Sequence, residues 1–454
     1  MSEVAFWFRR DLRLDDNVGL SYACSKGLTV RFFFIFDPRI LDPLPRDDHR
    51  VSFLWNQLSH LGRELQERGQ LLQVWYGPPS EVWKTILSLY PKIQFVVCNH
   101  DYEPYARERD EAIRALCQQS GVTFYSFKDQ VIFEKSEIVT QNQEVFRVFT
   151  PYKKKWLSRL TPESTKEARV TWSSLPPLKG QGAVTEKVRK RGSLSPIFLC
   201  SMEDIEEIGF KKSQKIPKEH FFHDEVLRYY GRRRDYPAEE KGTTRLGLYL
   251  RFGLVSVRQC VRQALRLKAY DWLSELIWRE FFMMLLYHFP DTVNRPFRKE
   301  FNSFPYRYQE SEWQRWCAGE TGVPIVDAGM RELNQTGYMH NRVRMIVASY
   351  LTKHLLHDWR LGERYFSQKL FDFDLSANVG NWQWVAGCGV DAAPYFRIFN
   401  PSIQQKRFDP NCEYVKRWVP EAFSSSYPPP LVDHSFARQR ALSAFQRLPK
   451  GYVK

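Results

Sequence analysis

The sequence predicts an α/β domain with a doubly wound parallel sheet, followed by an all-α domain, on three observations. In the first third of the 454-residue chain, short apolar runs alternate with amphipathic helical patterns. A stretch rich in Pro, Gly, Ser, Lys and Arg follows at 171–196. Beyond Phe221 the pattern is helical to the end of the chain. We therefore expect domains at 1–135 and 217–454, joined by a linker at 136–216.

Five apolar runs predict the strands of the sheet. They are VAFWF (4–8), LTVRFFFIF (28–36), LLQVWY (71–76), IQFVVC (93–98) and VTFYSF (122–127). Continuous runs rich in β-branched and aromatic residues are typical of parallel strands that are covered on both faces. Helical patterns lie between several of the runs, at 51–68, 80–90 and 104–119. This alternation is typical of an open sheet with helices on both faces.

Two aspartates follow predicted strands. Asp37 comes directly after the second run, and Asp101 comes shortly after the fourth. Because open α/β sheets bind ligands at the carboxyl ends of their strands, both are candidate ligand contacts. Capping a helix or turning the chain explains both residues at least as well from the pattern alone.

The charge balance favours a polyanionic partner. Lys and Arg total 67 against 52 Asp and Glu, which gives a formal net charge of +15. Nucleic acid and an acidic membrane surface would both attract such a chain. The start of the chain has no apolar signal-peptide core, and no run of eighteen apolar residues occurs anywhere. We expect a protein of the cytoplasm, or one associated with the nucleoid.

Neither cysteine nor histidine spacing predicts a metal site. The eight Cys form no C-x-x-C pair, so the sequence lacks the pattern of a zinc or disulfide framework. His354 and His357 precede Asp358, but histidines three residues apart on an exposed helix face are usually surface residues. The sequence GCGVDA at 387–392 fits a dinucleotide-binding pattern, yet it follows a helical run rather than a strand.

The segment 372–401 combines aromatic residues with polar groups that a purely apolar core does not use. On a helix, Asn378 and Trp382 are four residues apart and share a face. Trp384 points roughly 200° away from Trp382. The segment could therefore present an amide and one indole to one ligand and the second indole to another. A buried aromatic helix that packs on its neighbours is the alternative.

A possible phosphate site follows the charged stretch RYYGRRRDYPAEE. Thr243 and Thr244 stand at a predicted helix start, where hydroxyls and free N–H groups suit a phosphate, with Arg245 as the counter-charge. The signal is weak alone, because Thr is common at helix starts for capping reasons.

Two predicted helices carry polar groups among apolar ones. Glu275, Trp278 and Arg279 share a face of a helix at 272–289 that is apolar nearly all round, and should therefore be buried. A ligand or an internal Glu–Arg pair would stabilise the charge equally well. Asn341 and Met345 lie one turn apart on a helix at 342–358, with Arg342 beside them. These groups suit an unstacked base pair and a phosphate, or a helix cap.

Ordered motifs over almost the whole chain resemble the DNA photolyase and cryptochrome family. The motifs are FWFRRDLRLDDN, TRLGLYLRFG, ELIWREFF, TGVPIVDAGMREL, MHNRVRM and DFDLSANVGNWQWVAGCGVDAAPYFRIFNP. The resemblance implies an amino-terminal antenna domain and a carboxyl-terminal helical domain that holds FAD in a U shape. The class I enzymes, which split cyclobutane pyrimidine dimers, are most similar. A blue-light-sensing cryptochrome that signals through a protein partner without repair is the alternative.

The resemblance also implies which residues contact FAD. Those implied at its phosphates are Tyr230, Thr243, Thr244, Arg245, Leu246 and Gly247. The family often has Ser at the last of these positions, so the chain lacks one hydroxyl contact there. Those implied at the isoalloxazine are Arg344, Asp372, Asp374 and Asn378, the last near its N5.

For the lesion, the resemblance implies light-driven repair of damaged DNA, single or double stranded, by a monomer. Excited reduced FAD gives one electron to the flipped-out dimer, the ring bonds break and the electron returns. The residues implied at the dimer are Glu275, Asn341, Met345, Trp278 and Trp384, with the two Trp stacked on it. The residues implied at DNA phosphates are Arg234, Arg342, Arg397 and Lys406.

Two departures from the family pattern affect electron supply and light harvesting. The photoreduction chain is usually three Trp, but here it would be Trp382, Trp359 and Tyr306, which predicts slower photoreduction. As single residues, all three also suit a core. The folate-binding relatives carry Asn-Glu where this chain has Tyr105 and Ala106. A deazaflavin-type antenna is therefore favoured over folate; it is expected near Asp37, Asp101 and Glu103.

Overall fold

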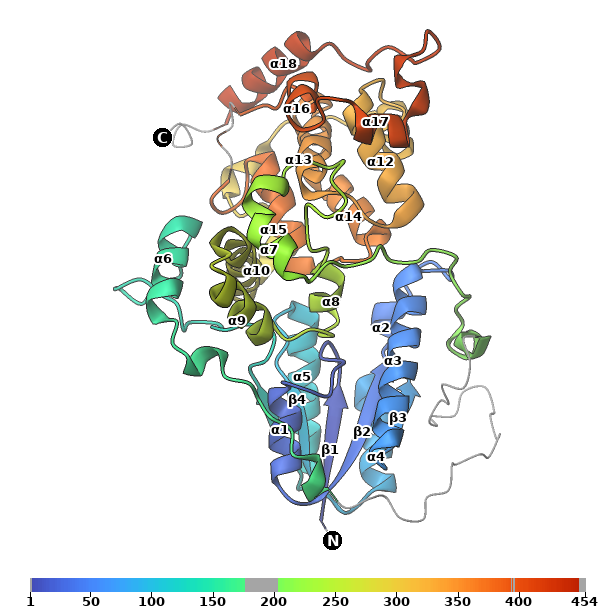
Figure 1. The fold of residues 1–454 in the computed structure, drawn as a ribbon, viewed down its shortest axis with the longest axis vertical. Helices are drawn as coiled ribbons and strands as arrows, with labels where there is room; N and C mark the ends of the chain where they lie inside the picture. The colour runs from blue at the N-terminus through green and yellow to red at the C-terminus, as the bar shows by residue number, and fades with distance from the viewer. Residues whose placement is uncertain (1, 176–202, 393, 395–396, 449–454) are drawn as a thin grey trace. The chain divides into compact units, whose positions relative to one another are not determined.

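The computed structural model describes residues 2–175, 203–392, 394 and 397–448. The basic sequence KVRKRG at 187–192, in the predicted linker, lies outside these residues. The chain forms two compact units, each built from separated segments (Figure 1). The first comprises Met1–Glu134, Leu160–Ile216 and Gly247–Gln263, and the second comprises Lys135–Arg159, Pro217–Leu246 and Ala264–Lys454. The sequence predicts domains that are each one continuous segment, divided at 135 and 216, whereas each of these units combines three separate segments.

The first unit is built on a five-stranded parallel sheet with strand order β3-β2-β1-β4-β5 (Figure 1). The strands are β1 (Glu3–Phe8), β2 (Thr29–Phe36), β3 (Leu72–Tyr76), β4 (Ile93–Asn99) and β5 (Thr123–Phe127). Each predicted strand is confirmed, and each end lies within one residue of its prediction. Every strand pair in the sheet is parallel, as the apolar runs predict.

Helices cover both faces of this sheet. The α1 (Val18–Ser25) and α3 (His49–Glu67) helices contribute to one apolar cluster, and α4 (Pro79–Leu89) and α5 (Pro104–Gln119) contribute to the other. The short α2 (Pro38–Leu41) follows β2. Successive residues of a strand point to opposite faces, so two separate clusters mean two covered faces. The doubly wound prediction is confirmed.

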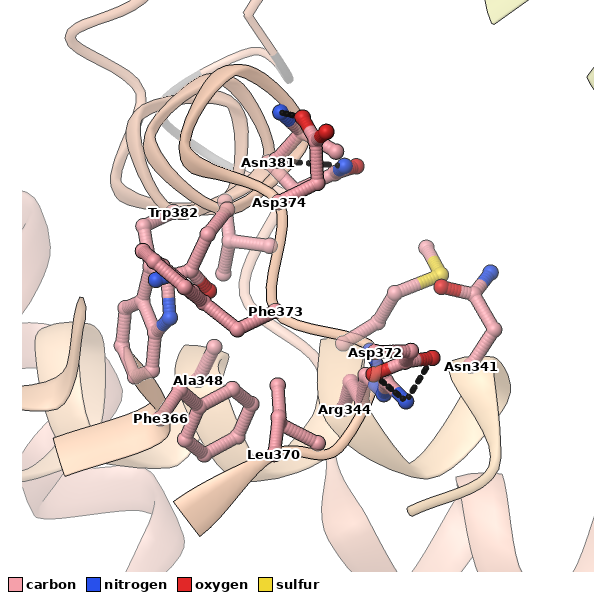
Figure 2. A pocket seen from close by; sticks show the side chains of 14 residues that line it. Asn341, Arg344, Ala348, Phe366, Leu370, Asp372, Phe373, Asp374, Asn381 and Trp382 are labelled. Atoms are coloured by element: carbon pink, nitrogen blue, oxygen red, sulfur yellow. Dashed lines mark hydrogen bonds and ion pairs between the residues drawn. The ribbon is translucent and has the colours of Figure 1, made fainter. Parts of the chain in front are cut away.

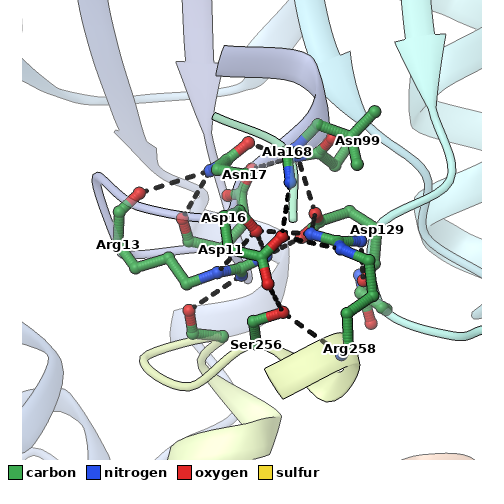
Figure 3. A network of polar contacts seen from close by, with 12 residues as sticks. Asp11, Arg13, Asp16, Asn17, Asn99, Asp129, Ala168, Ser256 and Arg258 are labelled. Atoms are coloured by element: carbon green, nitrogen blue, oxygen red, sulfur yellow. Dashed lines mark hydrogen bonds and ion pairs between the residues drawn. The ribbon is translucent and has the colours of Figure 1, made fainter. Parts of the chain in front are cut away.

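A buried polar network holds the segment 247–263 in the first unit (Figure 3). Arg258, near the start of α9 (Val257–Leu267), donates from Nε to Asp16 Oδ1 at 2.8 Å and from Nη2 to Asp129 Oδ1 at 2.8 Å. Desolvation raises the pKa of Asp129, but the Arg13 and Arg258 guanidinium groups outweigh it, so this pKa lies below its usual value. A buried carboxylate with two guanidinium partners stays charged, and removing one partner leaves an uncompensated charge.

The second unit is helical. Its longer helices are α6 (Phe149–Arg159), α7 (Asp224–Arg233), α10 (Tyr270–His288), α11 (Glu310–Ala318), α12 (Pro324–Thr336), α13 (Asn341–Ser349), α14 (Trp359–Lys369), α15 (Leu375–Ala386) and α18 (His434–Gln446). Shorter helices include α8 (Gly247–Arg251) of the first unit and, in the second, α16 (Pro401–Phe408) and α17 (Glu413–Trp418). Buried residues lie on all sides of α10, as its apolar sequence predicts. No helix in the described part of the chain is both long and apolar enough to cross a membrane.

The predicted helix at 342–358 is divided. Regular α13 ends at Ser349, and a π-helix runs from Tyr350 to His354. His354 and His357 are 1% and 0% exposed, so the expectation that they lie on an exposed face is wrong. The reason is tertiary: His354 Nε2 lies 2.9 Å from Nδ1 of His434 on α18, and His357 Nε2 lies 3.4 Å from Glu312 Oε2 on α11.

Candidate functional site

A cavity of about 80 Å³ opens in the second unit between α13, α14, α15 and the loop that joins the last two (Figure 2). It brings together seven of the predicted site residues: Asn341, Arg344, Met345, Asp372, Asp374, Asn378 and Trp382. Apolar side chains, including those of Phe366 and Leu370, complete its wall. The cavity therefore combines charged and amide groups with an aromatic lining, as the sequence of 372–401 suggests.

An ion pair forms one wall of the cavity. Arg344 Nη2 lies 3.1 and 2.9 Å from the two carboxylate oxygens of Asp372, and its Nε donates to the Met339 carbonyl at 2.7 Å. Desolvation lowers the pKa of Arg344, but Asp372 outweighs it and the pKa is raised. The guanidinium is therefore charged and held in place at the cavity surface.

The start of α15 orients the second wall. Asp374 is the N-cap residue of α15, and its carboxylate accepts from the Ala377 N–H at 3.2 Å and from the Ser376 hydroxyl. This cap fixes the first turn of the helix that carries Asn378 and Trp382. Both of these residues line the cavity and Trp384 does not, as their spacing predicts.

Glu363 orients Asn378, a role that the sequence analysis does not predict. Asn378 Nδ2 donates to the Glu363 backbone carbonyl at 3.0 Å and to its Oε1 at 2.9 Å. Because the amide NH₂ is directed to Glu363, its remaining polar atom, Oδ1, is an acceptor. Burial raises the pKa of Glu363, against the opposing effect of the Asn378 hydrogen bond. The available signal was a carboxylate placed between Trp359 and Phe366 on a helix with an apolar face.

Trp382 lies in a dense aromatic environment. It is 2% exposed, and its ring meets Phe366 edge-on at 5.0 Å and Trp316 edge-on at 6.4 Å. Gly362 allows this packing, because a Cβ at that position would lie 2.1 Å from the Trp382 ring. Trp316 in turn stacks on Trp313, with ring centroids 5.4 Å apart.

The other two predicted relay residues belong to the same apolar core as Trp382. Trp359 is 1% exposed and begins α14. Tyr306 is half-buried and packs on Phe304 with ring centroids 4.7 Å apart. The ring that contacts Trp382 from α11 is Trp316, which the sequence did not single out.

The residues predicted at FAD phosphates do not line the cavity in Figure 2. Thr244 is buried, and its hydroxyl accepts from the Trp272 indole N–H at 3.3 Å. Arg245 has a left-handed backbone, with φ of 52°, and its Nη2 donates to the Glu240 carbonyl at 3.0 Å. The remaining members are Thr243, Tyr230 on α7, the buried Leu246, and Gly247, which begins α8 of the first unit.

One atom in this group indicates an anionic ligand. Arg245 Nε is buried and has no hydrogen-bond partner among the described residues. An unsatisfied buried donor on a charged group costs free energy unless a ligand or water accepts from it. A phosphate oxygen is a suitable acceptor for a guanidinium N–H.

An ion pair joins α7 to α10. The Arg234 guanidinium contacts the Glu275 carboxylate. Desolvation raises the pKa of Glu275, and Arg234 acts in the opposite direction without cancelling the shift. Glu275 therefore holds a proton to a higher pH than an ordinary glutamate does.

Asp235, the residue after Arg234, forms a second ion pair, with Arg342. Arg342 Nη2 lies 2.6 Å from Asp235 Oδ1, and its Nη1 lies 3.8 Å from Met345 Sδ. Arg397 and Lys406 are both exposed, the latter on α16. Among the four predicted DNA-binding cations, the two exposed residues lack the carboxylate contacts that Arg234 and Arg342 make within the described part of the chain.

The two predicted stacking residues differ in their surroundings. Trp384 is half-buried on α15 and packs against the main core of the unit. Two aromatic rings already stack on Trp278: Phe149 at a centroid distance of 3.6 Å and Phe282 at 5.5 Å. The nearly parallel Phe149 ring occupies one face of Trp278, so a base could stack on that face only if Phe149 moved.

The predicted antenna residues of the first unit are divided. Asp37 caps α2 by accepting from the Arg39 N–H at 3.0 Å, and it also accepts from the Tyr105 hydroxyl. It lines a hollow of about 280 Å³ with Tyr105 and Arg109. Asp101 and Glu103 instead contact Arg10, at 3.2 and 2.7 Å.

Asp101 remains a carboxylate under ordinary conditions. Desolvation raises its pKa, but nearby guanidinium groups, Arg10 first among them, outweigh it and lower the pKa to about 2. Of the three predicted antenna residues, only Asp37 faces the hollow.

Two family models match this chain. Residues 4–170 match the family described as DNA photolyase, and residues 272–425 match the FAD binding domain of DNA photolyase. The chain is 36% identical to the deoxyribodipyrimidine photo-lyase of Escherichia coli, over 99% of this chain and 100% of that protein. The Synechococcus protein of the same name is 33% identical, over 98% and 96%.

Solved structures agree. A bacterial class III photolyase from Agrobacterium tumefaciens superposes with a TM-score of 0.82 at 32% identity, over 98% of this chain and 97% of that one. The archaeal photolyase from Sulfolobus tokodaii, solved with two FAD molecules, gives 0.80 at 33% identity, over 98% and 100%. The chain therefore belongs to the DNA photolyase family.

Proposed function

We propose that this protein repairs cyclobutane pyrimidine dimers in DNA, using light and a reduced FAD held in the helical unit. The observation that carries the proposal is the cavity in Figure 2, where Arg344, Asp372, Asn378 and Trp382 meet in a chain of this family. Relatives that match over almost their whole length are named deoxyribodipyrimidine photo-lyase. A cryptochrome that signals without repair is not better supported by the relatives.

The residues present fit FAD. The Arg344–Asp372 pair and Asn378 Oδ1 offer hydrogen-bonding groups suited to the edge of an isoalloxazine, and the buried Arg245 Nε lacks an acceptor that a phosphate would provide. Thr243, Thr244 and Tyr230 are proposed to join Arg245 at the phosphates, while Leu246 and Gly247 stay predictions. When bound, excited reduced FAD would supply one electron to the dimer and recover it afterwards.

At the flavin edge, Asn378 Oδ1 is proposed to accept a hydrogen bond from an N–H of the flavin. Glu363 holds the amide so that Oδ1 is its remaining acceptor. Asp374 supports this arrangement from the N-cap of the same helix. The chain thus fixes its acceptor before the cofactor binds, which avoids a reorganisation cost during the reaction.

At the lesion, Glu275, Asn341 and Met345 are proposed to contact the dimer. The raised pKa of Glu275 lowers the cost of protonating its carboxyl, and a protonated carboxyl can donate to a pyrimidine carbonyl where negative charge develops. Trp384 is proposed to pack on the dimer, with Trp278 forming a second apolar wall. Both indoles would exclude water from the reacting bonds.

Outside the pocket, the cations are proposed to bind the phosphate backbone. The exposed Arg397 and Lys406 are available for direct contacts. Arg234 and Arg342 must first exchange part of their contact with Glu275 and Asp235. A dimer is poorly stacked, so flipping it out of a duplex costs only a few kcal/mol. A monomer binding single- or double-stranded DNA is the simplest assembly.

For electron supply, Trp382, Trp359 and Tyr306 are proposed to carry electrons to the flavin from the surface. Trp382 and Trp359 lie in one core cluster, and Tyr306 packs against it. A tyrosine must lose a proton to be oxidised as readily as a tryptophan, so we expect slower photoreduction than in a three-Trp chain.

For light harvesting, we propose a flavin-type second chromophore, such as a deazaflavin, in the hollow that Asp37 lines. Tyr105 and the Arg109 guanidinium offer an aromatic ring and a charge at its wall. The Sulfolobus tokodaii relative was solved with two FAD molecules, one implicated in light harvesting. Asp101 and Glu103, which pair with Arg10, do not line the hollow.

Flavin retention and lesion binding in the dark test this proposal. The purified protein should carry equimolar FAD and should bind an oligonucleotide with one thymine dimer more tightly than the undamaged oligonucleotide. A (6-4) photoproduct in the same sequence is the lesion control. A colourless protein, or equal affinity for damaged and undamaged DNA, would contradict the proposal.

A further inference from the structure

The indole of Trp278 packs against two phenylalanine rings, those of Phe149 and Phe282. The Phe149 ring is nearly parallel to it, with an interplanar angle of 8° and a centroid distance of 3.6 Å. Phe282, one turn along α10, also stacks on the indole, at a centroid distance of 5.5 Å and an interplanar angle of 27°. Phe281 adds an edge contact at 5.7 Å and 78°. Trp278 is nonetheless half-buried rather than buried.

Phe149 comes from a distant part of the chain and is itself firmly held. It is 7% exposed and is the first residue of α6. Its backbone N–H donates to Asp391 Oδ2 at 3.1 Å, in the segment that follows α15. Within α6, the Trp156 indole N–H donates to Glu280 Oε1 on α10 at 2.6 Å. These contacts fix the ring of Phe149 against α10.

The aromatic group of Phe149, Trp278 and Phe282 lies beside the proposed lesion contacts. Trp278 is three residues after Glu275 on α10, so the two side chains share a face of this helix. On the α6 side, Lys153 Nζ donates to Ser274 Oγ at 3.1 Å, one residue before Glu275. The rings that hold Trp278 therefore also set the wall next to the Glu275 carboxyl.

We propose that Phe149 is a positioning residue for lesion recognition: it fixes the Trp278 indole in the orientation in which it meets the pyrimidine dimer. This inference rests on the proposed function. A side chain that is already immobilised does not lose rotamer freedom when the ligand binds. Without the Phe149 ring the Trp278 side chain is mobile in the free protein, so the free-energy cost of ordering it reduces the affinity for the dimer.

The test compares dissociation constants for a dimer-containing and an undamaged oligonucleotide in the dark. Phe149→Ala should weaken binding of the dimer about three- to tenfold, the cost of immobilising one such side chain, with little change for undamaged DNA. Phe149→Tyr keeps the stacked ring and should bind like the wild type. Phe149→Leu keeps apolar volume without the stack and should resemble alanine, which tests the ring even if the alanine variant does not fold.

A double-mutant cycle separates positioning from general destabilisation. In a Trp278→Ala background, Phe149→Leu should cause no further loss of dimer preference, because the ring it positions is absent. Phe124→Ala is the matched control: Phe124 is also 7% exposed but belongs to the first unit, so the variant should keep the wild-type preference.

Two results would overturn the inference. Wild-type dimer preference in Phe149→Leu would show that the stack does not matter, and additive losses in the cycle would show that Phe149 acts independently of Trp278. If the wild-type protein itself showed no preference for the dimer, the proposed function would fail first. That outcome is distinct, because it does not depend on any variant.

Discussion

Asn378 shows how much of this site depends on a single side-chain orientation. Its Nδ2 is held by two acceptors of one residue, Glu363, so its Oδ1 is the group left for a ligand. On the opposite wall, Arg344 is fixed in the same manner by Asp372 and the Met339 carbonyl. Preformed polar groups of this kind increase affinity because their ordering cost is met during folding.

Arg344 provides the first residue-scale prediction. Arg344→Ala leaves the Asp372 carboxylate without its cation and removes a donor from the cavity. We expect FAD retention to fall at least tenfold, since hydrogen bonds to charged groups contribute about 1.5–3 kcal/mol. The ratio of flavin to protein absorbance after gel filtration measures this. Arg364→Ala, at an exposed position on α14, is the control and should retain FAD; equal retention in both variants would refute the role of Arg344.

A second residue-scale prediction concerns pH. Burial lowers the pKa of both His340 and His354 to about 3, with nearby positive groups contributing. Both therefore stay neutral in the fold, whereas the unfolded chain protonates them near pH 6.5. Their contribution to stability is complete above pH 6.5 and is lost as the pH falls toward 3. The expected loss is about 1.4 kcal/mol per pH unit for each histidine.

Urea unfolding between pH 7 and pH 5 measures this dependence. His354→Gln should reduce the slope of unfolding free energy against pH by about 1.4 kcal/mol per unit. His60→Gln changes an exposed histidine of the first unit and should leave the slope as it is. A slope unaffected by His354→Gln would mean that this histidine titrates equally in both states.

At the scale of elements, the sequence predicts the features that depend on local residue patterns. The continuous apolar runs identified all five strands, and the spacing of Asn378 and Trp382 put them on one face of α15. What it missed depends on contacts between distant segments. Glu363 orients Asn378 from another helix, and Phe149 reaches Trp278 across more than a hundred residues. No periodicity in the chain encodes such pairings.

The same reason explains why the helical interior was only partly anticipated. His354, in the π-helix at Tyr350–His354, packs against α18, and His357 lies beside Glu312 of α11, so both histidines are buried although an isolated helix would expose them. Likewise, the ion pairs of Arg258 assign 247–263 to the first unit, although the local sequence there is helical like that of the second.

The aromatic elements around Trp382 give the prediction at this scale. Tyr306→Trp should increase the rate of flavin photoreduction several-fold, because an indole is oxidised without prior loss of a proton. Transient absorption after a blue flash, with an external reductant present, measures the rate. An unchanged rate would contradict the assignment of Tyr306 to the terminal position.

Trp316→Phe is the comparison for this experiment. Trp316 contacts Trp382 and stacks on Trp313, but it is not part of the proposed chain. In the Tyr306→Trp background this substitution should leave the increase intact. Loss of the increase would place Trp316, rather than Tyr306, on the route.

At the scale of the whole molecule, the net charge of +15 fits a partner with a phosphate backbone. The exposed Arg397 and Lys406 can neutralise phosphates without first breaking an ion pair of the protein. Substituting either by Ala should reduce the slope of log K against log salt for duplex DNA by about 0.9. Fluorescence titration at several salt concentrations gives the slope. Lys84→Ala, at an exposed position of the first unit, should not alter it; equal changes in all three variants would indicate unspecific attraction alone.

The measurement that tests the central claim most directly is light-dependent repair by the photoreduced protein. An oligonucleotide with one thymine dimer is mixed with protein whose FAD is fully reduced, and half of the sample is illuminated with blue light while the other half stays dark. We predict that intact thymines return only in the illuminated sample, and that protein stripped of FAD restores none. Bound, fully reduced FAD and tight binding of the dimer without any light-dependent repair would contradict the account.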